Sequence, residues 1–474
     1  MADRELPIAR LATTDDDGHR IWLYPADVKG FFRRRRTALQ AILILVFLAL
    51  PWLRIGGHQA LLLDVPNRRF AIFGITFWAH DAPMLIFVAG GAAMTLAFVT
   101  AIWGRAWCGW ACPQTVFIDS VFRRIENWIE GDAVTRRRLD EAPWSLPKFA
   151  RKALKWSLFG SISLVLSHSF LAYFVGTAAL EKMVASAPSD NPGSFLFMAL
   201  FTGAVLFDFG WFREQFCTIV CPYGRFQSVL MDDQSVAVVY DARRGEPRRG
   251  TSAGGPQGDC VNCYRCVQVC PTGIDIRRGV QLECIACTAC IDACDEVMRR
   301  LKKPEGLIRY GTAAALANPG SEKPKSLRRW IYLALLSACL GGLALTVHGR
   351  TTLALQLIRA PEAPYQELPG DTHEILNHYK MELRNQSFDS QTVEIRVPPA
   401  EAGRGVTIVV SNLAPSLGGG ESERADLFIR VPRKLLTQGK GSIHLEFVAR
   451  DEQSHSQAAE SVTVKEVRLV GPYL

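Results

Sequence analysis

Thirteen cysteines lie in this chain of 474 residues, all of them between Cys108 and Cys339. Eight of them repeat one pattern twice, Cys-x2-Cys-x2-Cys-x3-Cys, and Pro271 follows the first run. Because residues 348–474 contain no cysteine, we interpret the grouped thiols as metal ligands and not as the disulfides of a secreted scaffold. The eight residues are Cys260, Cys263, Cys266, Cys270, Cys284, Cys287, Cys290 and Cys294.

The spacing within each run has a physical reason. Three cysteines at intervals of three wrap a tight loop around three corners of an iron–sulfur cubane, and the fourth ligates the other cluster. The sequence therefore predicts a domain like the bacterial ferredoxins, with two [4Fe–4S] clusters that relay single electrons. CxxC pairs also bind zinc, but two zinc sites would not require this duplicated pattern. We assign Cys260, Cys263, Cys266 and Cys294 to cluster 1, and Cys284, Cys287, Cys290 and Cys270 to cluster 2.

A second cysteine pattern, Cys-x3-Cys-Pro, occurs twice before the cluster runs. Residues four apart on a helix share one face, so each pair should direct two thiols the same way. Four soft sulfurs at one membrane surface could hold Cu(I), form redox-active disulfides or line a docking site for another electron carrier. The alternative is that they are small buried residues at helix ends. The four residues are Cys108, Cys112, Cys217 and Cys221.

Other polar residues are weaker candidates. We interpret His168, inside an apolar segment, as a hydrogen-bonded structural histidine, although polar groups in a membrane are often functional. Asp208 is interpreted as a solvated residue, and Cys339 as a small core residue. Near the C-terminal domain three residues could touch copper, but we interpret them as part of a surface turn. They are His373, His378 and Met381.

Five apolar segments can position these thiols, since about 20 residues are needed to cross a bilayer. Helices buried in a soluble core are the alternative, but Arg clusters and aromatic residues at the segment ends favour an α-helical transmembrane bundle. The segments are 37–55, 83–103, 156–176, 194–212 and 330–347.

The formal net charge of +8 is concentrated beside these segments. Residues 33–36, 104–155 and 213–329 are rich in Lys and Arg, whereas the loops 56–82 and 177–193 are not. The positive-inside rule then predicts a cytoplasmic N-terminus and cluster domain, and a periplasmic C-terminal domain. Membrane orientation explains the basic residues, so we expect a lipid-embedded protein and no nucleic-acid partner.

The chain after the fifth apolar segment has a different pattern. From about Tyr379 onward, short alternating strands separated by turns predict an immunoglobulin-like β-sandwich without a disulfide. By composition, residues 245–258 predict a flexible linker. The predicted domains are a cytoplasmic N-terminal segment (1–36), a membrane domain of four helices (37–229), a cytoplasmic two-cluster domain (230–329), the fifth transmembrane helix (330–347) and the periplasmic sandwich (348–474).

With these spans, motifs and domains, the whole chain resembles the CcoG family of cytochrome c oxidase accessory proteins, also called FixG or RdxA. The WCGWACP stretch and the two cysteine runs are also similar to NapH-type quinol dehydrogenases. The resemblance implies a multi-pass protein of the bacterial inner membrane that reduces Cu(II) to Cu(I) for copper chaperones during assembly of cbb3-type oxidase. It implies that the eight cysteines hold the clusters and that Cys108, Cys112, Cys217 and Cys221 bind or reduce copper.

The leading hypothesis is thus a metalloreductase whose clusters are reduced by an unknown cytoplasmic donor and in turn reduce Cu(II) at the four thiols. Two alternatives stay open. One is a quinol-oxidising electron-transfer subunit of the NapH type. The other is a non-catalytic assembly scaffold whose sandwich docks the oxidase.

Overall fold

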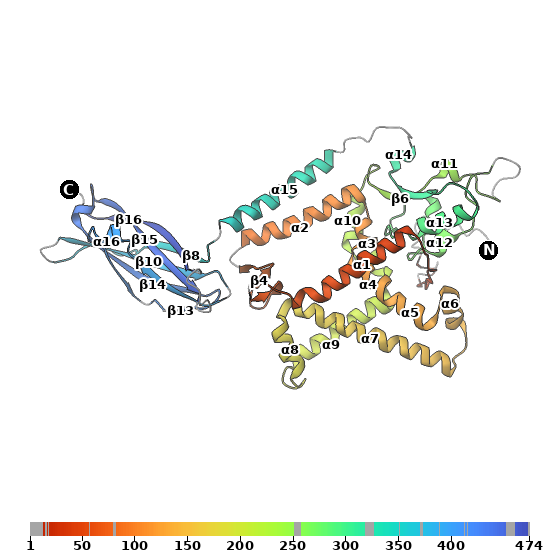
Figure 1. Cartoon of the computed structure of the whole chain (residues 1–474), viewed down its shortest axis with the longest axis horizontal. Coiled ribbons are helices and arrows are strands. Elements are labelled where there is room, and N and C mark those ends of the chain that lie inside the picture. The colour runs from red at the N-terminus through yellow and green to blue at the C-terminus, as the bar shows by residue number, and fades with distance from the viewer. Residues whose placement is uncertain are drawn as a thin grey trace. The chain divides into compact units, whose positions relative to one another are not determined.

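The computed structural model describes residues 13–14, 17, 19–55, 57–78, 82–250, 257–317, 327–349, 351–369, 373–387, 389–411, 413–414, 416–451 and 460–472. The chain forms two compact units (Figure 1). One comprises Met1–Asp64 with Phe87–Gly341, and the other comprises Val65–Ile86 with Gly342–Leu474. The predicted linker 245–258 lies partly outside the described residues.

Among the described residues, five helices are long and apolar enough to cross a membrane, in the number that the sequence predicts. The first span starts at Phe31 and not at residue 37, and the third starts at Leu146 and not at residue 156. In both helices, basic residues within the first three turns pair with buried carboxylates, so charged residues before the apolar segment are part of the helix. The helices are α1 (Phe31–Ala49), α2 (Ala82–Trp103), α7 (Leu146–Val175), α9 (Pro192–Phe207, extended by a π-helical turn over Asp208–Phe212) and α15 (Leu327–His348).

Small and aromatic residues set the contacts between these helices. Helices α2 and α15 lie side by side (Figure 1), and the Cys339 side chain of α15 packs over Gly90 and Gly91 of α2. Cys339 therefore serves as a small packing residue. On α7, Phe159 is fully buried against the Phe122 ring, 4.8 Å between centroids.

Short helices at the ends of the spans carry both Cys-x3-Cys-Pro motifs. After α2 come α3 (Ala106–Trp110), α4 (Pro113–Phe117), a π-helical turn (Ile118–Phe122), α5 (Arg123–Glu130) and α6 (Ala133–Glu141). Helix α8 (Thr177–Ala185) follows α7, and a π-helical turn (Phe216–Val220) with α10 (Pro222–Leu230) follows α9. The remaining short elements of this unit are β1 (Arg54–Ile55), β2 (His58–Gln59) and β3 (Leu61–Asp64).

A buried ion-pair network fixes these short helices. Both carboxylate oxygens of Glu126 accept from Arg213, at 2.6 and 3.0 Å, and one also accepts from Arg136 at 3.0 Å. Lys155 on α7 lies 3.7 Å away. Although burial opposes it, the charge and hydrogen bonds of Arg213 lower the pKa of Glu126 to about 2. The network therefore joins α5, α6, α7 and the chain after α9.

The cysteine-rich domain, which we call the cassette (residues 237–311), is a small α+β unit. Strands β6 (Ala237–Tyr240) and β7 (Ile308–Gly311) pair antiparallel across its base. Its core is formed by Val238, Ile276, Ile291, Met298 and Ile308. Its helices are α11 (Ala242–Gly245), α12 (Arg265–Gln268), a 3₁₀ turn (Ile276–Arg278) and α13 (Ala289–Arg300), followed by α14 (Ala313–Ala317).

The C-terminal domain is a sandwich of two antiparallel sheets, in the orders β12-β14-β10-β8, with β9 beside β10, and β13-β11-β15-β16. Side chains alternate between core and surface along β10, and Leu383, Leu427 and Phe447 are fully buried. The first strand, β8, precedes Tyr379, where the alternating pattern was expected to begin, but it lies within the predicted sandwich range 348–474. The strands are β8 (Leu353–Arg359), β9 (Gln366–Glu367), β10 (Glu374–Asn385), β11 (Gln391–Arg396), β12 (Thr407–Ser411), β13 (Ser416–Leu417), β14 (Ser422–Pro432), β15 (Lys440–Asp451) and β16 (Glu460–Val470).

Three short elements remain, β4, β5 and α16. Strands β4 (Arg69–Ile72) and β5 (Ile75–Trp78) form an antiparallel hairpin before α2, and a helical turn, α16 (Pro399–Ala402), precedes β12. Buried Glu401 in this turn pairs with Arg404 at 3.0 Å.

Replacing Glu126 with Gln tests the ion-pair network. Leaving the buried Arg213 and Arg136 without their counter-ion should destabilise the protein by about 3–5 kcal/mol at pH 7, measured as thermal unfolding in detergent. Since folding lowers the pKa of Glu126 from 4.5 to about 2, its contribution is complete above pH 4.5 and is lost as the pH falls through about 2. The difference from wild type should shrink over that range.

The control is Glu141→Gln, which removes an exposed pair with Arg137. Exposed pairs contribute about 0–1 kcal/mol, so this variant should unfold close to the wild-type temperature. Equal destabilisation by the two substitutions would contradict the role assigned to Glu126.

Candidate functional site

Each Cys-x3-Cys-Pro motif is broken at its second cysteine. Cys112 and Cys221 both have extended backbone (ψ 127° and 111°) and directly precede the first helical residue of α4 and α10. The following proline disfavours the helical conformation of the residue before it and is well suited to begin a helix. The expectation that each pair lies on one continuous helix is therefore wrong. Instead, both cysteine amides bond five residues back, to Trp107 and Phe216.

The break nevertheless brings the four thiols into one neighbourhood. Electrostatic interactions link Cys108 with Cys112 and Cys221, and link Cys217 with the other three. All four are partly buried and carry no disulfide. Within the described part of the chain, no three Cys, His, Asp or Glu side chains lie close enough to hold a single metal ion. The thiols gather as predicted, but not at the spacing of one preformed ion site.

Burial controls the protonation of these thiols. It raises the pKa of Cys108 to about 11, and it also raises the pKa values of Cys112 and Cys217. Gln227 on α10, which is fully buried, contacts the Cys108 sulfur through its amide nitrogen at 3.2 Å. At neutral pH Cys108, Cys112 and Cys217 are therefore protonated, so a metal ion that binds them must displace protons.

The cassette cysteines line two small cavities of about 20 Å³ each. The fourth cysteine of each run lines the same cavity as the first three cysteines of the other run. This is the grouping that the crossed assignment of cluster ligands requires. Cys266 lies at the wall between the two. The thiols surround a space instead of converging on one point, which fits a cluster and not a single zinc ion. The first cavity is lined by Cys260, Cys263, Cys266 and Cys294; the second by Cys266, Cys270, Cys284, Cys287 and Cys290.

The two cavity loops share an unusual backbone. The residues on either side of Cys263 and of Cys287 all adopt the left-handed conformation, with φ between 51° and 64°. Non-glycine residues rarely do so, and such conformations persist where the surrounding structure enforces them. Their repetition at equivalent places shows that both runs wrap in the same way. The residues are Asn262, Tyr264, Ala286 and Thr288.

The first Cys-x3-Cys-Pro motif packs directly on the second cavity loop. A Cβ at Gly109 would lie 2.5 Å from the Ile285 carbonyl oxygen and 2.8 Å from that of Ala286. Cys108 packs against the buried cluster of side chains that includes Ile285 and Cys287. The motif and the cassette loop are thus in van der Waals contact.

Polar bonds fasten the same contact. The Arg105 guanidinium donates to the carbonyl of Leu282 in the cassette and, at 3.1 Å, to that of Gly224 on α10. The Trp110 indole donates to the Tyr310 hydroxyl at 3.0 Å. Together these bonds hold the two membrane-surface motifs and the second cavity at fixed separation.

Helix α1 makes a second junction with the cassette. Asp292 on α13 accepts from the backbone amides of Phe32 and Arg33, at 3.1 and 2.7 Å, and so caps the start of α1. Arg36 donates to the Cys287 carbonyl at 2.5 Å. A buried cation therefore lies beside the main chain of the second cavity.

The weaker candidates separate into distinct environments. His168 bonds to the Leu164 carbonyl within its own helix, at 2.8 Å. Asp208 accepts a hydrogen bond from Gln114 at 2.9 Å, so the interpretation that it is only solvated is wrong. Gln114 lies two residues after Cys112, next to the first motif.

The three residues near the C-terminal domain do not form a copper site. Met381 is 1% exposed in the sandwich core, whereas His378 faces outward from the same strand, stacks on Phe428 and bonds to Asp426 at 2.9 Å. Interpreting these two as a surface turn is wrong, because both lie within β10; His373 directly precedes the strand. Side chains on opposite faces of a strand cannot share a ligand.

Sequence reasoning missed Gly109, Arg105 and Gln227. Gly109 stands inside the motif that drew attention only for its thiols. A glycine between two tryptophans in WCGWACP signals close backbone approach, but its partner loop is about 175 residues away in the chain.

A bundle of five apolar helices that carries a domain with two cysteine-lined cavities and a β-sandwich defines a multi-pass membrane protein of the iron–sulfur electron-transfer class. Family models agree. A 4Fe-4S dicluster domain matches residues 212–313, and a 4Fe-4S binding domain matches residues 84–132. The Ig-like fold at the C-terminal of FixG matches residues 343–472, which confirms the immunoglobulin-like prediction.

Similar proteins identify the family. RdxB of Cereibacter sphaeroides is 38% identical over 79% of this chain and 81% of its own length. RdxA of the same organism is 34% identical over 83% and 87%, respectively. The nitrogen fixation protein FixG of Rhizobium meliloti is 39% identical over 62% and 58%. The chain belongs to the FixG/RdxA family, as the resemblance predicted.

Substituting Gly109 with Ala tests the contact between the first motif and the cassette. The added methyl group must displace the Ile285–Ala286 backbone, and overpacking of this kind costs about 1–3 kcal/mol. We expect a changed EPR spectrum for the cluster in the second cavity and a lower unfolding temperature. Gly160→Ala is the control, because no atom lies within 4 Å of a Cβ there. An unchanged EPR spectrum in Gly109→Ala would contradict the contact.

The crossed ligand assignment is tested by Cys294→Ser. It should remove about half of the iron, from the same cluster that Cys260→Ser affects, because the fourth cysteine of one run completes the other site. The measurements are iron per chain, acid-labile sulfide and the EPR spectrum of the reduced protein. If Cys294→Ser instead reproduced the spectrum of Cys284→Ser, each run would ligate its own cluster.

Proposed function

We propose that this protein reduces Cu(II) to Cu(I) at the membrane surface, with Cys108, Cys112, Cys217 and Cys221 as the copper-binding thiols. The observation that carries the proposal is the position of Cys108. It packs against the buried cluster of side chains that includes Ile285 and Cys287 of the second cavity loop, and it interacts with the other motif thiols. Cys108 thus connects the cassette with the other three motif cysteines.

The side chains suit this chemistry. Thiolates prefer Cu(I) to Cu(II), so sulfur ligands favour the reduced ion. The [4Fe–4S] clusters that the cassette cysteines would hold supply single electrons, and each copper ion takes one. Because burial raises the pKa values of Cys108 and Cys112, copper is expected to bind with release of thiol protons. Gln227 holds the Cys108 sulfur toward the second motif.

Orientation and partners belong to the same proposal. The basic segments 33–36, 104–155 and 213–329 support a cytoplasmic cassette, and a periplasmic sandwich then follows from five spans. An unidentified cytoplasmic donor would reduce the clusters. Copper chaperones would receive Cu(I) for assembly of cbb3-type oxidase in the bacterial inner membrane.

One observation favours a second function for the motif thiols. The 4Fe-4S binding domain that matches residues 84–132 contains Cys108 and Cys112 but none of the eight cassette cysteines. Four thiols without single-ion spacing suit a third cluster as well as a transient copper site. In that case the four cysteines would extend the electron relay instead of binding copper.

Copper reduction is tested by Cys108→Ser in the full-length protein. The protein is reduced, freed of excess reductant and mixed with Cu(II), and Cu(I) is measured with a chromogenic chelator. Loss of a metal ligand should lower the rate by about tenfold or more, while Cys339→Ser, a packing cysteine elsewhere in the bundle, should leave it unchanged. An undiminished rate in Cys108→Ser would overturn the copper assignment.

Iron analysis of the same samples separates the two functions. A copper site predicts an iron content unchanged by Cys217→Ser. A third cluster predicts that this substitution removes about one third of the iron, with the cassette signals retained.

A further inference from the structure

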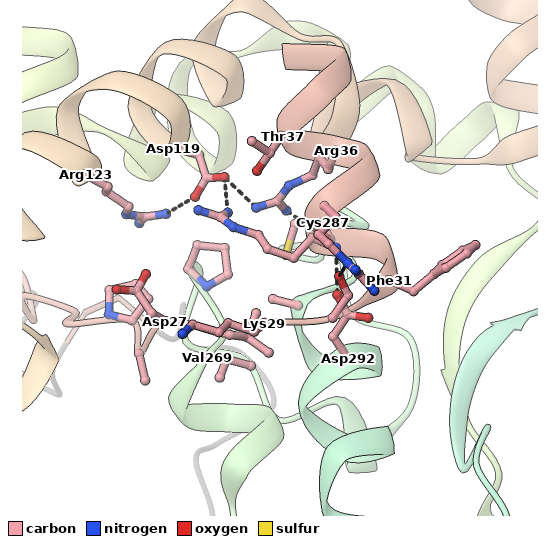
Figure 2. Close-up of a pocket in the computed structure, with 18 of the residues that line it drawn as sticks. Asp27, Lys29, Phe31, Arg36, Thr37, Asp119, Arg123, Val269, Cys287 and Asp292 are labelled. Atoms are coloured by element: carbon pink, nitrogen blue, oxygen red, sulfur yellow. Dashed lines mark hydrogen bonds and ion pairs between the residues drawn. The ribbon is translucent and has the colours of Figure 1, made fainter. Parts of the chain in front are cut away.

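A cavity of about 910 Å³ lies beside the cassette, separate from the four motif thiols. Figure 2 shows it between the start of α1, the Asp119–Arg123 turn and the cassette. Its cassette wall includes Val269, Pro271 and Cys287, which belong to the two loops of the second cluster cavity. Anything bound here would lie next to that cluster site.

Guanidinium groups dominate the floor of this cavity. Asp119 alone accepts from Arg33 and from Arg36, the latter at 2.5 Å, and lies 3.9 Å from Arg123 (Figure 2). One carboxylate thus serves three cations. The charge of Arg36, Arg33 and Arg123 outweighs burial and lowers the pKa of Asp119, which keeps it ionised. Arg123 also pairs with Glu214, so one positive charge remains without a counter-ion among these three arginines.

Three arginines around the cavity each carry a buried donor without an acceptor. The Nε atoms of Arg36, Arg123 and Arg136 are buried, have no hydrogen-bond acceptor and belong to residues that line the cavity. Arg36 and Arg136 are only 3% and 4% exposed. A buried donor without an acceptor is costly. Such groups are seldom orphaned unless a ligand or water completes them.

The rim adds exposed cations. Arg34 and Arg124 bond only to the Gly30 carbonyl and the Thr37 hydroxyl, and neither they nor Lys29 has a carboxylate partner in the described part of the chain. The acidic residues of the cavity are already engaged. They are Asp27 with Asn127, Asp292 with the α1 amides, Asp295 with the Gly306 amide and Glu305 with Arg299.

We propose that this cavity binds a phosphate-bearing redox nucleotide and is the site where the cassette receives its electrons. Guanidinium groups are the preferred partners of phosphate oxygens. The volume suits a ligand of nucleotide size, since small-molecule sites span about 300–1,000 Å³. A phospholipid headgroup carries the same phosphate, but the cavity wall formed by the cluster loops favours the nucleotide.

The electron balance is simple for a dihydroflavin mononucleotide. Two successive one-electron transfers oxidise it to the flavin, release two protons to solvent and reduce each of the two clusters by one electron. The proposal rests on the electron-transfer role of the cassette and not on copper as the acceptor.

Binding is measured by titrating flavin mononucleotide into the full-length protein in detergent, with fluorescence quenching as the readout. Riboflavin, which lacks only the phosphate, should bind at least about tenfold more weakly, and the double variant Lys29→Gln/Arg124→Gln should lose affinity for the mononucleotide to a similar degree. Arg137→Gln, which replaces an exposed arginine of α6 outside the cavity, is the control and should bind as wild type.

Three outcomes would overturn the proposal. Equal affinity for riboflavin and the mononucleotide would remove the phosphate site. Unchanged binding by the double variant, with normal iron content, would place the ligand elsewhere. If only a short-chain anionic phospholipid bound, and the double variant abolished that binding, the cavity would be a lipid headgroup site.

The copper proposal is tested independently in the same preparation. Cys108→Ser should bind the mononucleotide with wild-type affinity whatever happens to Cu(II) reduction. Loss of binding in Lys29→Gln/Arg124→Gln alone, and loss of copper reduction in Cys108→Ser alone, would show that the two sites are separate.

Discussion

The close approach of Gly109 to the Ile285–Ala286 backbone is the constraint on which the rest of the structure depends. Electron transfer falls steeply with distance, so a relay cassette is useful only if it is held at a fixed place on its membrane domain. A side chain at residue 109 would separate the two by its own width. Arg105 and Trp110, on either side of the glycine, then fasten the contact with polar bonds. The motif WCGWACP is therefore a docking element as much as a source of thiols.

Buried charge maintains that arrangement from the other side. Asp119 and Glu126 each gather several cations at the ends of the spans, and Asp292 caps α1 from the cassette. These bonds connect the first, third and fourth spans to the short helices that follow α2. The two carboxylates differ in their surroundings. Arg213 binds both oxygens of Glu126 among α5, α6 and α7, whereas Asp119 and its arginines line the cavity. The first arrangement is structural, and the second leaves binding capacity toward the cavity.

The sequence was sufficient for whatever depends on local pattern. Cysteine spacing gave the crossed grouping of ligands, and uninterrupted apolar runs gave five spans. It failed where a long-range partner decides local structure. Arg36 looks like a flanking charge of the positive-inside rule. It nevertheless lies within α1, because Asp119 and the Cys287 carbonyl accept hydrogen bonds from its guanidinium. The sequence pattern assigns Met381 and His378 to a surface turn, but the alternation of side chains along β10 directs Met381 into the core.

The helix break at Cys112 has a local cause, the proline that follows it, whereas the place to which the break brings the thiol depends on the second motif. Proline ends the preceding helix, and the freed cysteine amide turns back to Trp107 instead of continuing the helix. The resulting kink directs the thiol toward the second motif, where burial keeps it protonated. A cation that arrives there exchanges its charge for protons, so the net charge of a poorly hydrated site changes little. A protonated thiol is therefore stable in a low-dielectric setting without metal, and the proposed binding of a metal ion there requires loss of its proton.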